Sequence, residues 1–333
     1  MSNELAIYKQ KRIRALQNIY NANISRMYSA LVANVRGVQN ARITVNIKQA
    51  RINNLVAQYN KDAAALGDAF NKNKLAVQNF APPTVKPAKR KRALLVGINY
   101  IGTTNELFGC INDVMSIKER ITNAGFSDIS VVTDLTPKKP TRATILEEFK
   151  RLLSTSQSDD LLFFCYSGHG FYTLDRNSDE TDGRDEMIVS CDLQGIVDDE
   201  LKALIQTHLK PGATLFAMFD SCFSGSVLDL KYQYLDSLNY DNYTENDKQL
   251  ETQGNVFMIS GCTDNQTSAD AFINNKASGA MTWSLLEAAK EKTGCTWREL
   301  IKSMRDKLKT SEFTQIPQFS SGTFVNIDTP IFI

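Results

Sequence analysis

The chain of 333 residues lacks long apolar runs and closely spaced cysteine pairs. No stretch reaches the roughly 18 apolar residues that a membrane-spanning helix needs. The opening MSNELAIYKQKR lacks the apolar core of a secretory signal, and the six cysteines contain no CxxC motif. We therefore expect an intracellular, cytoplasmic protein with reduced thiols and no transmembrane segment.

Histidine is scarce, because the chain contains only His169 and His208. Neither has the spacing of a zinc ligand relative to the cysteines, which argues against a thiolate metal site. His208 lies inside a helical pattern and receives no role. His169 stands between glycines in YSGHG, directly after an apolar run, and is the histidine that the sequence favours for chemistry.

Proline is absent from residues 3–79, where apolar residues recur every three or four positions. This pattern predicts two or three amphipathic helices over residues 1–80, followed by a Pro/Lys-rich linker at 81–92. Residues 1–92 carry 17 Lys/Arg against 3 Asp/Glu, whereas residues 93–333 carry 21 against 34. The two segments, about +14 and −13, are expected to have different roles.

Three interpretations of the basic helical segment stay open. Its apolar stripes and charge fit self-association or intramolecular docking onto the acidic remainder of the chain. The charge alone fits nucleic acid or an anionic membrane, although no recognised motif supports nucleic-acid binding. The linker fits a cleavable pro-region. We favour an interaction or regulatory segment, and do not expect nucleic acid as the partner.

From residue 93 onward, short apolar strands alternate with helical patterns. The predicted strands are 93–98, 129–134, 161–168, 214–222, 255–262 and 322–327. Strands that are apolar throughout and separated by helices indicate an α/β fold: a mostly parallel six-stranded sheet flanked by helices. In such sheets the active site lies at the carboxyl ends of the strands.

Two predicted strands end in residues that can do chemistry. LLFFCYSGHG delivers His169, and TLFAMFDSC delivers Cys222, so parallel strands would bring both to one edge. A Cys–His pair supports nucleophilic catalysis, because the thiolate attacks while the imidazole handles the proton. Gly170 allows a substrate backbone to approach, and the backbone N–H groups of Gly170 and Cys222 are candidate oxyanion donors.

These motifs resemble those of the caspase-like cysteine peptidases, and of metacaspases in particular. YSGHG is followed 53 residues later by DSCFSG, and five further motifs of residues 92–333 are similar to that family in the same order: GCINDV, DGRDE, IVDDE, ISGCTDNQTSADA and GAMTWSLLEA. The family usually has a histidine directly after the nucleophile, where this chain has Phe223. Residues 1–80 lie outside the resemblance.

The resemblance implies a caspase-like fold with Cys222 as nucleophile and His169 as general acid/base. It also implies a primary specificity pocket lined by Cys110, Asp113, Ser167 and Asp220. Two carboxylates in one pocket favour a cationic side chain, so protein or peptide substrates with Arg or Lys at the cleaved position are expected. Considered alone, Asp113 is more simply interpreted as a carboxylate in the first turn of a helix, where it interacts favourably with the helix dipole.

An acidic stretch at residues 175–200 provides oxygen atoms that suit a hard cation. An EF-hand is excluded, because Glu180 stands where its loop needs glycine. The metacaspase resemblance implies instead an activating Ca²⁺ site, with Asp185 as a less certain substitute for the first ligand. The implied ligands are Asp182, Asp198, Asp199 and Asp229.

Residues 230–253 are polar, rich in tyrosine and without core periodicity, which predicts a flexible surface insertion. Lys231, Lys248 and the run KPAKRKR are candidate exposed sites for self-cleavage of a zymogen. The sequence thus predicts a calcium-stimulated cysteine endopeptidase. The alternative is a catalytically silent scaffold with the same fold, assembled through its N-terminal helices.

Overall fold

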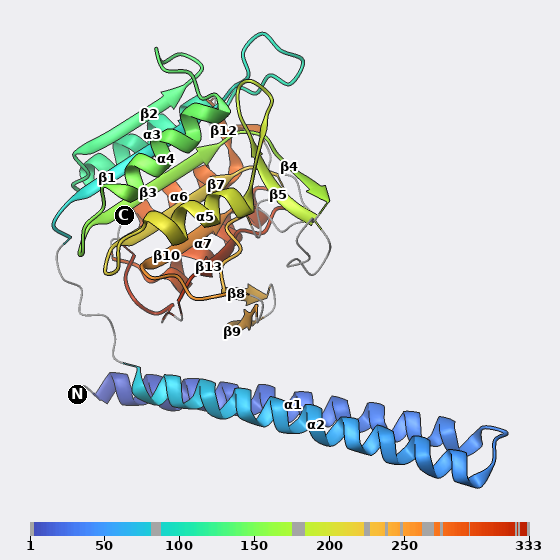
Figure 1. Cartoon of the computed structure of the whole chain (residues 1–333). Coiled ribbons are helices and arrows are strands. Elements are labelled where there is room, and N and C mark those ends of the chain that lie inside the picture. Colours follow the sequence, from blue (N-terminus) through green and yellow to red (C-terminus); the bar gives the residue numbers. More distant parts are fainter. Residues whose placement is uncertain are drawn as a thin grey trace. The chain divides into compact units, whose positions relative to one another are not determined.

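The chain forms two compact units, Met1–Pro83 and Thr84–Ile333, in the computed structural model (Figure 1). We call the first the hairpin and the second the α/β unit. The structure describes residues 3–80, 88–174, 184–222, 227–236, 239–246, 249–261, 270–273, 276–292, 294–323, 325 and 327–331.

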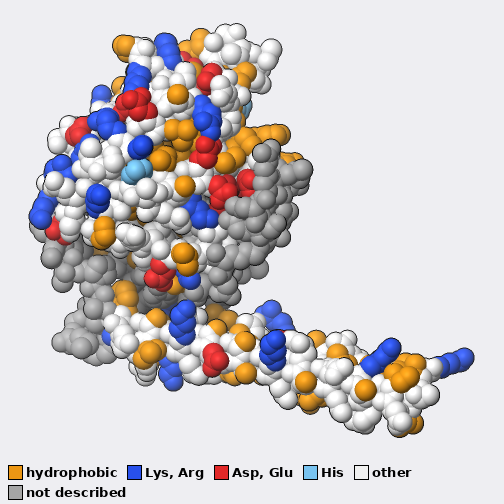
Figure 2. Space-filling view, in the orientation of Figure 1, with side chains coloured by type: hydrophobic (Ala, Val, Ile, Leu, Met, Phe, Trp, Pro, Cys, Tyr) orange, Lys and Arg blue, Asp and Glu red, His pale blue; other side chains and the backbone are white. Residues whose placement is uncertain are grey.

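The hairpin consists of two long helices, α1 (Asn3–Asn40) and α2 (Val45–Asn79), which run antiparallel. The ring of Tyr20 lies 5.0 Å from that of Phe70, and Tyr28 lies 6.2 Å from Tyr59. At 1.5 Å per residue, α1 is about 57 Å long. Figure 2 shows Lys and Arg side chains spaced along the hairpin, with hydrophobic side chains between them.

Two helices alone bury little surface. Among the described side chains of the hairpin, only Val77 and Arg12 are buried, while Val45 and Leu75 are exposed. The predicted apolar stripes are therefore only half covered. In the described part of the chain, neither these helices nor any other is both long and apolar enough to cross a membrane.

The α/β unit is built on one central sheet with the strand order β2-β1-β3-β7-β10-β13-β8-β9. Its first five strands are parallel, as expected: β2 (Asp128–Thr133), β1 (Lys91–Gly97), β3 (Leu161–Ser167), β7 (Thr214–Asp220) and β10 (Asn255–Ser260). The other three follow by antiparallel pairing: β13 (Gln318–Ser321), β8 (Tyr232–Asp236) and β9 (Asn239–Glu245). The predicted α/β fold is confirmed, but the sheet has eight strands instead of six, because β8 and β9 extend it beyond β13.

Helices cover both faces of this sheet because its strands are apolar on both sides (Figure 1). One face packs against α3 (Cys110–Asn123), α6 (Ala280–Glu291) and α7 (Trp297–Thr310). The other packs against α4 (Arg142–Ser154) and α5 (Asp198–His208). Alternate residues of one strand serve the two cores, as Leu95 and Leu94 of β1 illustrate.

Two small sheets stand beside the central one. The first contains β4 (Gly170–Leu174), β5 (Arg184–Val189) and β6 (Gly195–Val197), and the second contains β11 (Asp270–Ile273) and β12 (Lys276–Gly279). β4 follows β3 almost directly, and β12 leads straight into α6. These short strands therefore adjoin the edge of the sheet where the predicted catalytic residues lie.

Three details of the sequence prediction were wrong. The last strand is Gln318–Ser321, not residues 322–327. The predicted linker ends too late, since β1 already begins at Lys91. The predicted flexible insertion contains β8 and β9, because Tyr232 and Tyr234 alternate onto one face and are buried in the core.

Lys231 in that segment is only half exposed, and its Nζ donates to the carbonyl of Gln249 at 3.2 Å. Lys248 lies outside the described residues.

Candidate active site

The predicted catalytic residues follow two adjacent parallel strands. Ser167 at the end of β3 is paired in register with Asp220 at the end of β7, and the N–H of Gly168 donates to the carbonyl of Asp220 at 3.3 Å. A Cβ atom added at Gly170 would lie 2.0 Å from the carbonyl oxygen of Cys222. The two strand ends thus stay together beyond the sheet, and bring the segments of His169 and Cys222 to one edge.

The imidazole of His169 is held by a backbone carbonyl. Its Nε2 lies 2.8 Å from the carbonyl oxygen of Asn105, in the loop between β1 and α3. A carbonyl oxygen only accepts hydrogen bonds, so Nε2 carries the hydrogen. In the neutral ring this leaves Nδ1 as the nitrogen that can accept a proton. The arrangement suits a general base.

A buried tyrosine pair supports the peptide around His169. The hydroxyls of Tyr100 and Tyr166 lie 3.0 Å apart, and the N–H of His169 donates to the Tyr100 hydroxyl at 2.9 Å. The Tyr100 ring is 4.7 Å from the imidazole. Burial raises the pKa of both phenols, so they stay neutral donors and acceptors. A Cβ at Gly168 would lie within 3 Å of both hydroxyls, which explains the glycine before the histidine.

Two predicted pocket residues, Asp113 and Asp220, are brought together. Asp113 in the first turn of α3 is 1% exposed, and Asp220 at the end of β7 is 4% exposed. A Cβ added at Gly279 would lie 2.8 Å from Oδ2 of Asp113 and 2.2 Å from Oδ2 of Asp220. Both carboxylates therefore border the same glycine.

Each carboxylate accepts several hydrogen bonds. Asp113 accepts from the hydroxyls of Ser167 at 2.9 Å and Ser278 at 2.6 Å, and from the N–H of Gly279 at 3.0 Å. Despite these donors, burial and then the neighbouring charge of Asp220 raise the pKa of Asp113 to about 7. The predicted pocket residue Cys110 begins α3 and is buried one turn before Asp113.

Three of the four expected metal ligands lie in the described residues, and the structure brings them together. One carboxylate oxygen each of Asp198, Asp199 and Asp229 lies within 4.8 Å of the others. Oxygen ligands on opposite sides of a Ca²⁺ ion are about 5 Å apart, so this cluster fits such an ion. Asp185 is buried on β5, and Asp182 lies outside the described residues, as does Phe223.

The electrostatics of this acidic cluster also fit a cation. Burial first, and then the charge of Asp229, raise the pKa of Asp198 to about 9. The ammonium of Lys202 lies 3.3 Å from Oδ2 of Asp229 and offsets part of the negative charge. The site therefore holds more carboxylates than one lysine balances.

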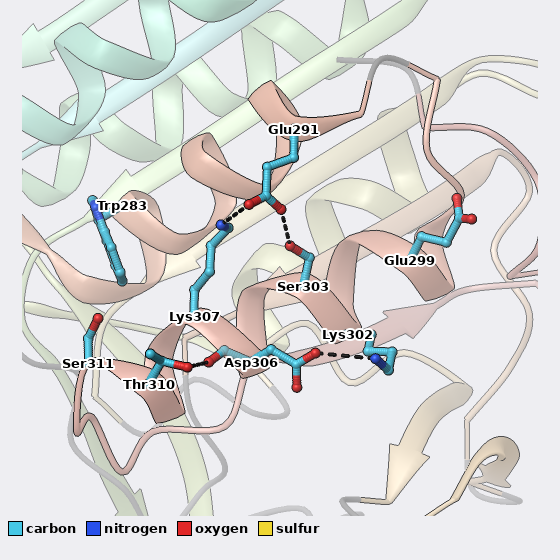
Figure 3. Close-up of a pocket in the computed structure, with 9 residues that line it drawn as sticks. All are labelled: Trp283, Glu291, Glu299, Lys302, Ser303, Asp306, Lys307, Thr310 and Ser311. Atoms are coloured by element: carbon cyan, nitrogen blue, oxygen red, sulfur yellow. Dashed lines mark hydrogen bonds and ion pairs between the residues drawn. The ribbon is translucent and has the colours of Figure 1, made fainter.

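A separate cleft of about 600 Å³ opens between α6 and α7 (Figure 3). Four of its charged groups form two ion pairs, Lys307 with Glu291 at 2.5 Å and Lys302 with Asp306 at 3.3 Å. Its lining includes none of the predicted site residues. The cleft is thus distinct from the candidate active site.

Sequence reasoning missed the residues that support the site. Asn105 acts through its backbone carbonyl, which no side-chain pattern reveals. Ser278, Gly279 and Thr282 bond the carboxylates, yet the motif GAMTWSLLEA, which contains the last two, contributed only to the resemblance. Tyr100 carried a weak signal, as a polar aromatic just after an apolar strand.

The chain is similar in sequence to known proteins. Residues 91–231 match the family described as metacaspase, peptidase C14 domain. Metacaspase-1A of Neurospora crassa is 35% identical over 292 residues, which cover 72% of this chain and 64% of that protein. Metacaspase-1 of Ajellomyces capsulatus is 36% identical over 291 residues, which cover 72% of this chain and 82% of that protein.

A solved structure supports the fold alone. The crystal structure of protein GSU0716 from Geobacter sulfurreducens aligns with a TM-score of 0.54 and 23% identity, covering 72% of this chain and 97% of that chain. The family follows from the sequence matches. The chain belongs to the metacaspase family of cysteine peptidases.

Proposed function

We propose that this protein is a calcium-stimulated cysteine endopeptidase that cleaves after Arg or Lys. The observation that carries the proposal is the juxtaposition of the Asp113–Asp220 pair with the segments of His169 and Cys222 at the ends of β3 and β7. A reactive Cys–His pair beside buried negative charge suits a substrate with a cationic side chain next to the scissile bond. The predicted cytoplasmic location rests on the sequence.

The proposed reaction is acyl transfer through Cys222. Nδ1 of His169 takes the thiol proton, and the thiolate attacks the scissile carbonyl to form a tetrahedral intermediate. The protonated imidazole then gives its proton to the leaving amine as the C–N bond breaks. Water, deprotonated by the same imidazole, hydrolyses the thioester and regenerates the thiol.

The surroundings of the pair support these steps. The carbonyl of Asn105 holds the hydrogen on Nε2, so Nδ1 is the nitrogen left to accept the proton. Backbone N–H groups of Gly170 and Cys222 are the proposed donors to the oxyanion, and preorganised donors of this kind contribute strongly to acyl transfer. The close approach of Gly170 to Cys222 requires a residue without a side chain.

Specificity is assigned to the carboxylate pair. A guanidinium or ammonium group placed against Asp113 and Asp220 would replace the repulsion between them with attraction. A substrate ending in Asp would add a third negative charge to the same buried space. Cleavage after Arg or Lys is therefore proposed, and cleavage after Asp is not.

Asp198, Asp199 and Asp229 are the proposed ligands of an activating Ca²⁺ ion, with Asp182 and Asp185 as further candidates. The ion would supply positive charge that relieves the repulsion within the cluster. Asp229 follows Cys222 by only seven residues, so fixing Asp229 restricts the segment that carries the nucleophile. Activation is proposed to act through order in that segment, and not through the chemical step itself.

One experiment tests the main proposal. Fluorogenic peptides ending in Arg, Lys or Asp are incubated with wild type and with Cys222→Ala, with calcium and with EDTA. We expect turnover of the Arg and Lys peptides by wild type in calcium only. Preference for Asp would contradict the pocket assignment. Absence of all turnover would favour the scaffold, for which the half-covered apolar side chains of the hairpin are the supporting observation.

A further inference from the structure

Helix α6 begins at the candidate pocket without a capping side chain of its own. Its N-cap residue is Gly279, which has no side chain to accept from the first-turn N–H groups. Asp220 takes this role from another element: its Oδ2 accepts from the N–H of Thr282 at 2.8 Å. The carboxylate assigned to substrate specificity is thus also the N-terminal cap of α6.

The side chain of Thr282 adds a second bond to the same oxygen. Its hydroxyl donates to Oδ2 of Asp220 at 2.7 Å, within a fully buried environment. Two donors from one residue to one oxygen restrain the position of that oxygen. Hydrogen bonds to an ionised acceptor are about twice as strong as neutral ones, so the hydroxyl contributes substantially.

The neighbouring carboxylate is held by the same turn of chain. Asp113 accepts from the hydroxyl of Ser278 and from the N–H of Gly279. Residues 278–282 therefore contact both members of the pair, although those members come from α3 and β7. Gly279 leaves room for both carboxylates, because an added Cβ would lie less than 3 Å from each.

We propose that Thr282 is a positioning residue for substrate specificity, which holds the Asp220 carboxylate in the orientation that receives the cationic side chain of the substrate. This inference rests on the proposed cleavage after Arg or Lys. Thr282 does not contact the reacting atoms. Its loss should weaken recognition of the cation and leave the chemistry of Cys222 and His169 largely intact.

The test is steady-state kinetics in calcium with an Arg-ended peptide and its citrulline analogue, which has the same shape without the charge. Thr282→Val removes the hydroxyl at constant volume, and Thr282→Ser restores it. Thr282→Ala serves as a second variant if the valine does not fold. Ser284→Ala is the matched control, because Ser284 is buried in the same helix and its hydroxyl donates to the carbonyl of Met281 at 2.8 Å, away from the carboxylates.

We expect Thr282→Val to raise KM for the Arg peptide about tenfold or more, with kcat within about threefold of wild type. The Arg-to-citrulline ratio of kcat/KM should fall by a similar factor, and Thr282→Ser should recover it. Unchanged KM in Thr282→Val, an equal change in Ser284→Ala, or no recovery with serine would each overturn the inference.

Failure of the proposed function gives a different result. In that case wild type itself does not prefer Arg over citrulline, and the inference falls with it. If wild type shows the preference while Thr282→Val keeps it, only the role of Thr282 is wrong.

Discussion

Nε2 of His169 lies 2.8 Å from the backbone carbonyl oxygen of Asn105. This contact orients the imidazole through the main chain. The carbonyl accepts the Nε2 hydrogen, as the carboxylate of an acidic side chain would. The group that orients the histidine of the proposed Cys–His pair is therefore a main-chain atom in the loop before α3. Substitution of the Asn105 side chain leaves that carbonyl in place.

Replacement of either reacting residue should abolish peptide hydrolysis. Cys222→Ala and His169→Ala are each expected to lower kcat at least about a thousandfold, because nucleophile and base act as a unit. Turnover of the Arg-ended peptide measures this. Cys191→Ala is the matched control, as it removes a half-exposed thiol elsewhere in the α/β unit. Equal loss in the control would indicate a folding defect instead.

Recognition of the cation should strengthen as pH rises through about 7. Below that pH the raised pKa of Asp113 keeps a proton on the carboxylate pair, and above it the pair gains its second negative charge. The Arg-to-citrulline ratio of kcat/KM, measured from pH 5.5 to 8.5, isolates this effect from titration of the Cys–His pair. Asp113→Asn should flatten the profile at a low ratio. A flat profile in wild type would exclude Asp113 as the titrating group.

The same shifted pKa has a consequence for stability. Between about pH 4 and 7, native Asp113 holds a proton that the unfolded chain has released. The contribution of Asp113 to the free energy of unfolding therefore falls as pH rises through this range. Thermal unfolding of wild type and Asp113→Asn should therefore show a smaller loss of Tm with rising pH in the variant.

Calcium should stabilise the fold as well as activate the enzyme. An ion bound at a concentration 100 times its Kd contributes about 2.7 kcal/mol, which corresponds to a rise in Tm of about 5 °C or more for a unit of this size. Asp229→Asn should remove most of the rise, whereas Asp192→Asn, which changes an exposed aspartate of the acidic stretch at residues 175–200, should not. Thermal scans in calcium and in EDTA provide the measurement, and an equal rise in all three proteins would refute the assigned ligands.

The hydrogen bond from the N–H of His169 to the hydroxyl of Tyr100 should contribute to kcat. Tyr100→Phe removes the hydroxyl that accepts from the N–H of His169, and leaves a buried donor without that acceptor at a cost of about 1–3 kcal/mol. We expect kcat to fall about tenfold and Tm to fall by several degrees. Tyr172→Phe on β4 is the control. Wild-type kcat in Tyr100→Phe would show that the hydroxyl does not position the histidine.

Self-processing is expected to depend on both calcium and Cys222. Purified wild type incubated with calcium should yield fragments cut after Lys or Arg, which mass spectrometry identifies. Lys231 is half-buried and bonded to Gln249, so cleavage there requires local opening. An intact wild-type chain, or equal cutting of Cys222→Ala, would argue against self-cleavage.

The sequence predicts the strands that precede His169 and Cys222 better than it predicts the residues that hydrogen-bond to the candidate site. The apolar runs before His169 and Cys222 specify β3 and β7, because such runs are stable only when both faces are covered. β8 was not foreseen, since its alternating tyrosines look polar until β13 provides a partner. Asn105 acts through its backbone carbonyl, and Thr282 acts through hydrogen bonds to Asp220 on a distant strand. Neither interaction leaves a periodic pattern in the sequence.

The capping of α6 by Asp220 also bears on the order of synthesis. A growing chain that has been made as far as Cys222 already contains both reacting side chains, but Ser278, Gly279 and Thr282 do not yet exist. The strand that pairs with β10 on its far side, β13, comes later still. Of the donors to the carboxylate pair named above, only the hydroxyl of Ser167 has been made by then, so the pair gains the others when nearly the whole α/β unit has been translated.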